Sequence, residues 1–199
     1  MASALQNVGR WFGAFAGLAG IEHGWFELQQ GNVPPPGLMF PSLGPPCDPE
    51  AVWHNCEPAI TLLPSLQMAG IVSIILGALT VVWAMVLIGR WYGGPVLALL
   101  SILLLALGGG VVPPVIGLLG GLVAIRSPAM VTGRAGVRRA AAALWPWSLV
   151  AFFASLAAMV VAGQLSNELM TQYGLIVLVG IPLLMILTVV SAWAHDSVG

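Results

Sequence analysis

Three ionisable side chains lie close together near the end of the first apolar segment of the chain: Glu22, His23 and Glu27. Residues four apart on a helix are neighbours, so His23 and Glu27 can share a proton or supply two ligands to a metal ion. Glu22 points to another side of the same helix. Ionisable groups at membrane depth are costly and therefore indicate a function. These three residues are our candidates for proton, solute or ligand chemistry.

A structural role is the alternative for His23 and Glu27. Both are expected near the outer end of their helix, where they could reach the interface or hydrogen-bond the backbone of the following loop. They would then hold that loop against the helix end. Glu22 faces the bulky side of the helix, so it needs a partner helix, a proton or a water-filled cavity.

The polar loop that follows carries the other residues able to bind a metal ion. Histidine with carboxylates suits a divalent transition metal, although the spacing here matches no recognised site. Cys47 and Cys56 lie in the same loop, and an exported loop favours a structural disulfide between them. The sequence gives no indication of which cofactor, if any, is bound. The possible metal ligands in this loop are Asp48, Glu50, His54 and Glu57.

Composition places the chain in a membrane. Hydrophobic residues make up 59% of its 199 positions and charged residues only 7%, whereas a soluble domain carries about 25% charged residues. All six basic residues are arginines, which excludes a lysine nucleophile or Schiff base. A net charge of -1 argues against nucleic acid as a partner. We expect a multi-pass protein of the cell membrane.

The apolar runs predict an all-α integral membrane protein with a single transmembrane domain over residues 1–199. Four long helices and a central hairpin of two short ones give about six segments. The first is interpreted as a retained helix and not as a cleaved signal peptide. The glycines and prolines within 108–114 favour a turn between the short helices, although one crossing or a re-entrant hairpin stays open. The expected segments are 8–29, 65–89, 95–108, 111–125, 140–163 and 173–194.

The arginines predict the orientation of the chain. With a central hairpin, Arg10, Arg90 and the loop 126–139 fall on one side, which is then cytoplasmic. Both termini are expected on that side, and the proline-rich loop 30–64 on the outside. The arginine-rich loop 126–139 could also bind anionic lipid headgroups. Its arginines are Arg126, Arg134, Arg138 and Arg139.

A glycine stripe runs along the first helix. At about 100° per residue its members fall within one narrow arc. Such a stripe lets the backbone of another helix approach closely. The stripe consists of Gly9, Gly13, Gly17, Gly20 and Gly24.

Three functions compete on these observations. The favoured one is a non-enzymatic structural or accessory subunit, with the lipid bilayer and either a homo-oligomer or other membrane subunits as partners. The second is a small carrier or channel for protons or a small solute that uses Glu22, His23 and Glu27. The third is an enzyme or metal site at the outer face. The small number of polar groups within the membrane favours the first over a complete transport path.

Overall fold

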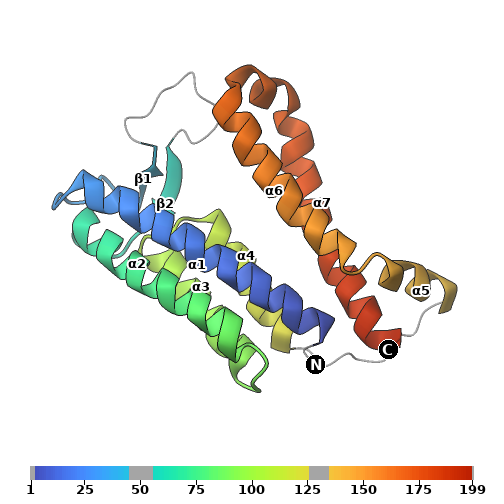
Figure 1. Cartoon of the computed structure of the whole chain (residues 1–199). Helices are drawn as coiled ribbons and strands as arrows, with labels where there is room; N and C mark the ends of the chain where they lie inside the picture. The colour runs from blue at the N-terminus through green and yellow to red at the C-terminus, as the bar shows by residue number, and fades with distance from the viewer. Residues whose placement is uncertain (1–2, 45–55, 126–134, 199) are drawn as a thin grey trace. The chain divides into compact units, whose positions relative to one another are not determined.

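The computed structural model describes residues 3–44, 56–125 and 135–198. Within them the chain is mostly helical, with one two-stranded sheet (Figure 1). Its elements in chain order are α1 (Ala4–Gln30), β1 (Met39–Leu43), β2 (Glu57–Ile60), α2 (Leu66–Val82) with a π-helical turn (Trp83–Leu87), α3 (Gly93–Leu107), α4 (Val112–Ile125), α5 (Ala135–Ala143), α6 (Trp147–Leu165) and α7 (Asn167–Val198).

The chain divides into two compact units, and the expected single transmembrane domain stays a prediction. The four-helix unit comprises residues 9–48 and 54–125 and contains most of α1, the sheet, and α2 to α4. The C-terminal unit comprises residues 1–8, 49–53 and 126–199 and contains α5 to α7 with the first turn of α1.

Two helices of the described chain are long and apolar enough to cross a membrane: Leu66–Leu87, which is α2 with its π-helical turn, and α7. The pair α5 and α6 makes a third if it is counted as one bent span. Helices α3 and α4 are apolar but shorter. These helices are compatible with an integral membrane protein. Charged residues interrupt α1, which is not among the apolar spans, so its membrane crossing stays a prediction.

The proline-rich loop contains a hairpin that its composition did not predict. Strands β1 and β2 pair antiparallel, and Pro41 lies opposite Pro58 in the register. Proline lacks the N–H that an interior strand must donate. A two-stranded ribbon consists only of edge strands, so both prolines are tolerated.

The C-terminal boundaries also differ from the expected ones. Residues 135–139, expected in the arginine-rich loop, belong to α5. The expected helix 140–163 is interrupted between α5 and α6, which meet at a bend of 46°. Pro146 lies in this break, because proline cannot continue a helix.

The polar stretch 164–172 was expected to be a loop but is almost entirely helical. Only Ser166 separates α6 from α7. Its hydroxyl accepts a hydrogen bond from the Leu169 N–H at 3.3 Å, as in an N-cap. Serine followed by acidic Glu168 in the first turn is a helix-start signal that the sequence contained.

The glycine stripe of α1 packs against helices of its own chain. A Cβ built on Gly17 would lie 2.5 Å from the Gly77 carbonyl oxygen, and one on Gly24 would lie 2.7 Å from that of Gly70. Both contacts are reciprocal, because Gly77 and Gly70 meet the carbonyls of Gly17 and Gly24 at 2.6 Å. Helices α1 and α2 are thus in backbone contact, as close-packed membrane helices are.

The other three glycines of the stripe meet α3, α4 and the π-helical turn. A Cβ on Gly13 would meet Ala84 and Leu97 at 2.7 Å, one on Gly20 would meet Leu104 at 2.8 Å, and one on Gly9 would meet Ala124 at 2.9 Å. The whole stripe is therefore used inside the four-helix unit, and it does not itself require a second subunit.

Hydroxyl groups join α6 to α7 in the C-terminal unit. The Ser148 and Ser191 hydroxyls are 2.6 Å apart, and Thr188 donates to the Ser148 carbonyl at 3.0 Å. All three side chains are buried. In the same unit the Asp196 carboxylate caps α1, accepting the N–H groups of Ala4 at 2.7 Å and Leu5 at 2.9 Å.

Candidate functional site

The C-terminal part of α1 buries two of its three ionisable side chains. His23 is 2% exposed and Glu27 is fully buried, whereas Glu22 is exposed. The helical period explains this division: His23 and Glu27 are one turn apart on the packed face, and Glu22 lies beside Trp25 on the outer face. The structure therefore brings together the pair that the sequence proposed.

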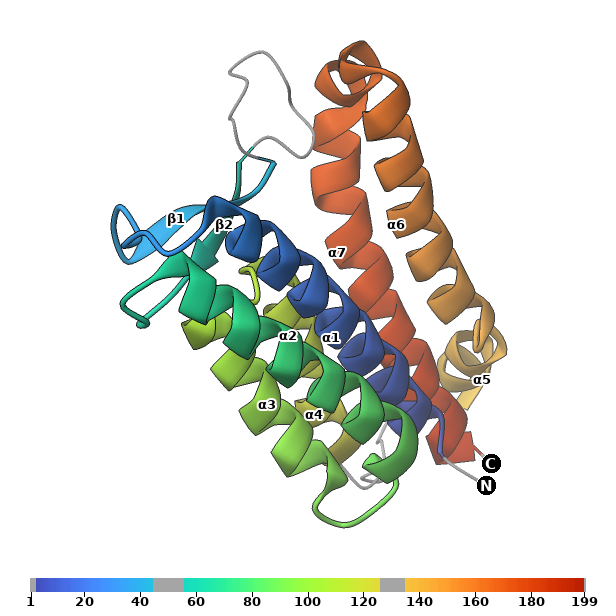
Figure 2. The ribbon, with the colours of Figure 1, turned by 60° about the vertical axis from the view of Figure 1, so that its left-hand side comes forward.

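The β1–β2 hairpin supplies the polar partners of this pair. Ser42 of β1 donates a hydrogen bond to Glu27 Oε1 at 2.9 Å and lies 3.4 Å from the His23 carbonyl oxygen. Glu57 of β2 places its Oε2 3.7 Å from His23 Nε2. Gln30 of α1 donates to the carbonyls of Pro41 and Ser42, both at 3.3 Å. The hairpin is thus bound to the end of α1 (Figure 2).

The turn between α3 and α4 closes the other side of the site. Gly108 has φ +115 and Gly110 has φ +82, values that favour glycine. A Cβ on Gly108 would lie 2.6 Å from Glu27 Oε2, and one on Gly110 would lie 2.5 Å from His23 Nε2. These two positions therefore require glycine both for their backbone conformation and for their contact with the buried pair.

Two further contacts fix this turn. Ser73 of α2 donates to the Leu107 carbonyl at 3.1 Å. The Leu62 N–H, just after β2, donates to the Ala106 carbonyl at 3.1 Å. Helix α2 and the segment after β2, which are distant in sequence, therefore hold the end of α3 and the turn that follows it.

We call His23, Glu27, Ser42 and Glu57 the α1 cluster. The exposed fraction of the side chains differs within the cluster: Glu57 is 37% exposed, whereas Glu27 is fully buried. Within the described part of the chain, Glu27 Oε2 is buried and makes no hydrogen bond. A carboxylate in this position needs a further donor, a proton or a cation to offset its desolvation.

Several of the predicted site residues are not in this cluster. Arg138 and Arg139 lie on α5. Within 3–44, 56–125 and 135–198, no group of three histidine, cysteine or acidic side chains is arranged to hold a metal ion. The disulfide and the proposed loop metal site stay predictions. Six residues that the sequence suggested lie outside the described part: Cys47, Asp48, Glu50, His54, Arg126 and Arg134.

Sequence reasoning missed two parts of the α1 cluster and its surroundings. Ser42 had no recognisable signal, because a serine in a proline-rich loop is usually solvated. The glycines at 108–110 were recognised as a turn, but the sequence did not show that this turn meets His23 and Glu27. That contact depends on the lengths of α3 and α4, whose 15 and 14 residues reach the same level as the end of α1.

No family model matches this chain, and neither a curated protein nor a solved structure matches it.

Proposed function

We propose that this chain is a structural or accessory subunit of a membrane assembly, and that its four-helix unit holds the β1–β2 hairpin as a cap. One observation carries this proposal: each member of the buried pair is engaged by a different strand of the hairpin. Ser42 of β1 binds Glu27 at 2.9 Å, and Glu57 of β2 lies 3.7 Å from His23. His23 and Glu27 thus serve to anchor the cap.

The packing next to the cluster supports this assignment. Gly24 and Gly17, on the same face of α1, are in backbone contact with α2. Helices that approach this closely do not favour a water-filled path between them. An anchoring role needs no such path, whereas conduction does.

Glu22 is the feature that favours a partner. It is exposed on the face of α1 that also presents Trp11, Leu18 and Trp25. Arg10 and Arg90 lie at the end of this unit opposite to Glu22, because the neighbouring Gly9 packs against Ile88 and Ala124 there. A carboxyl on an apolar face gains from a donor or a cation, which we assign to another subunit or a second copy.

The test compares Glu27→Ala with Glu22→Ala in the full chain reconstituted in lipid vesicles. Removing Glu27 takes away the shorter of the two hydrogen bonds of the buried Ser42 hydroxyl and leaves only the His23 carbonyl at 3.4 Å, at a cost of about 1–3 kcal/mol. We expect proteolysis in the hairpin to become about tenfold faster in this variant, which corresponds to ~1.4 kcal/mol. Glu22→Ala is expected to leave the hairpin protected and to reduce the mass of the solubilised assembly.

Two results would contradict the proposal. One is a hairpin that stays equally protected in Glu27→Ala, since the cap would then be held by other contacts. The other is a protein that is monomeric in mild detergent with or without Glu22, because no partner would then be bound through α1.

A proton or solute carrier is the second candidate, and one specific observation favours it. Glu27 Oε2 is buried without a hydrogen bond among the described residues and lies beside the turn between two short apolar helices. Broken apolar helices of this kind surround ion sites in transporters. Proton flux in proteoliposomes that Glu27→Gln abolishes would favour this candidate over the first. Flux equal to that of protein-free vesicles would remove it.

A further inference from the structure

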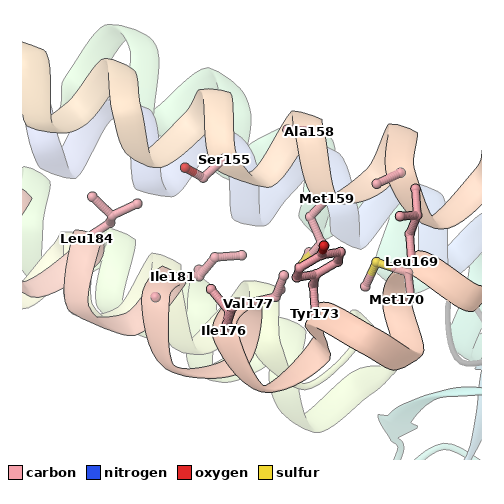
Figure 3. Close-up of a pocket in the computed structure, with 12 residues that line it drawn as sticks. Ser155, Ala158, Met159, Leu169, Met170, Tyr173, Ile176, Val177, Ile181 and Leu184 are labelled. Carbon is pink, nitrogen blue, oxygen red and sulfur yellow. The ribbon is translucent and has the colours of Figure 1, made fainter.

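An apolar groove of about 420 Å³ lies between α6 and α7 in the C-terminal unit (Figure 3). Its lining comes from one face of each helix, residues 155–162 of α6 and residues 169–184 of α7. Ser155 and Tyr173 supply the hydroxyl groups of the lining, and its other side chains are apolar. The volume lies within the range of ligand-binding cavities.

The groove exists because the small residues on these two faces do not pack closely against the opposite helix. Ala158 and Ala162 of α6 line it together with Gly180 of α7. A Cβ built on Gly180 would meet nothing within 4 Å. The side chains of Met159 and Tyr173 point toward one another across the space between the helices (Figure 3). These larger side chains hold the two backbones apart, so the space beside the small residues stays unfilled.

The dimensions of the groove decide what can occupy it. From Leu169 to Leu184 the lining extends over 15 residues of α7, or about 22 Å at 1.5 Å per residue. About 420 Å³ is open to the centres of water-sized spheres. Over this length it gives a mean section of ~19 Å² for the centres, which becomes a width of about 7 Å once the 1.4 Å radius is added on each side. That width suits one hydrocarbon chain at carbon contact distances of about 4 Å. A helix about 10 Å across would not fit.

We propose that this groove binds a single acyl chain of a membrane lipid. Helix α7 is long and apolar enough to span the bilayer, so an open apolar groove along it is surrounded by hydrocarbon and not by water. The polar residues at the α6–α7 junction, Ser166, Asn167 and Glu168, lie beyond one end of the groove and place the lipid headgroup there. This site is independent of the α1 cluster and of the function proposed from it.

The chain offers a matched pair of variants for a test. Gly174 and Gly180 lie on the same helix, and a Cβ on either meets nothing within 4 Å. Only Gly180 lines the groove. Gly180→Leu therefore fills the groove, whereas Gly174→Leu adds the same side chain elsewhere on α7. Ala162→Leu fills the groove from α6 and serves as a second variant if Gly180→Leu does not fold.

The measurement uses the full chain in detergent micelles with a phosphatidylcholine that carries a photoreactive group on its acyl chain. We expect saturable labelling of α6 and α7 residues that line the groove, and competition by unlabelled phosphatidylcholine. Leu at either position would occupy the space of the acyl chain and remove its packing contacts, so this labelling should fall more than tenfold in Gly180→Leu and Ala162→Leu. Gly174→Leu should label as the unmodified chain does.

Three results would overturn the proposal. Labelling that does not saturate would indicate only the general lipid layer around the protein. Equal labelling in the filled variants would show that the lipid lies elsewhere. Absence of labelling in the unmodified chain would show that something else covers the groove.

Discussion

Glycine plays opposite parts in the two units. In the four-helix unit, Gly17 of α1 and Gly77 of α2 face each other, and an added Cβ on either would lie 2.5–2.6 Å from the other's carbonyl oxygen. In the C-terminal unit, Gly174 and Gly180 of α7 have nothing within 4 Å of that position. A small residue permits close approach but does not enforce it: Ala158 and Ala162 of α6 line the same groove as Gly180, and no close contact forms there.

This difference explains what each unit can hold. Backbone contact between α1 and α2 leaves little freedom of register, so His23 and Glu27 meet the hairpin and the α3–α4 turn at defined distances. Helices α6 and α7 are joined by hydroxyl groups around Ser148 and are separated by a groove farther along. A rigid unit suits precise polar contacts, and an open pair suits a flexible apolar ligand.

The largest effect is expected where the packing is closest. Gly17→Leu must displace the Gly77 carbonyl and the backbone of Val81, both within 2.8 Å of the added Cβ. Overpacking against backbone exceeds the usual 1–3 kcal/mol, so we expect a loss of more than about 3 kcal/mol. Gly174→Leu should change stability by less than about 0.5 kcal/mol. Unfolding by SDS in mixed micelles measures both, and similar losses in the two variants would contradict the proposed difference between the units.

A smaller effect is expected at the turn that contacts the α1 cluster. Gly110 and Gly31 have similar backbone angles, φ +82 and φ +85, but an added Cβ meets His23 at 2.5 Å in the first and nothing within 4 Å in the second. Alanine costs about 1–2 kcal/mol in such a conformation. Gly110→Ala should cost about 1 kcal/mol more than Gly31→Ala, because His23 must also move.

The same unfolding measurement tests this pair of variants. Gly110→Ala is also expected to weaken the protection of the hairpin, since His23 lies 3.7 Å from Glu57. Equal losses in the two alanine variants would mean that only the backbone angle matters and that the turn does not support the α1 cluster.

The sequence predicted the helices better than it predicted their ends. Long apolar runs identify α2 and α7, and the consecutive glycines identify the turn at 108–110, because these signals are local. The break at Pro146 and the cap at Ser166 also have local signals. We nevertheless predicted one helix across Pro146 because the surrounding run is apolar, and a loop around Ser166 because the surrounding residues are polar. Local signals compete, and composition alone does not show which one prevails.

The candidate site could be predicted only in part. The spacing of His23 and Glu27 places both on the glycine face of α1, and the structure buries both. Their partners Ser42 and Gly110 come from elements that are distant in the chain. Which of these elements reaches the end of α1 depends on helix length and on the register of the glycine contacts. Both involve residues of α2, α3 and α4 that are distant from residue 23 in the chain.

The smallest effect is expected where α6 and α7 are joined by hydrogen bonds. Thr188 donates to the Ser148 carbonyl of the facing helix at 3.0 Å and to Leu184 of its own helix at 2.8 Å. Interhelical hydrogen bonds in membranes contribute about 0.6 kcal/mol on average. Thr188→Val keeps the shape of the side chain and should lose about that amount in the same unfolding measurement. Ser155→Ala, on the groove side of α6, is the control and should lose less, because its hydroxyl faces an apolar space. A loss of stability in Thr188→Val as large as that in Gly17→Leu would contradict this view. The α6–α7 pair would then depend on a single polar contact as strongly as α1 and α2 depend on their backbone contact. The looser packing assigned to the C-terminal unit would be wrong.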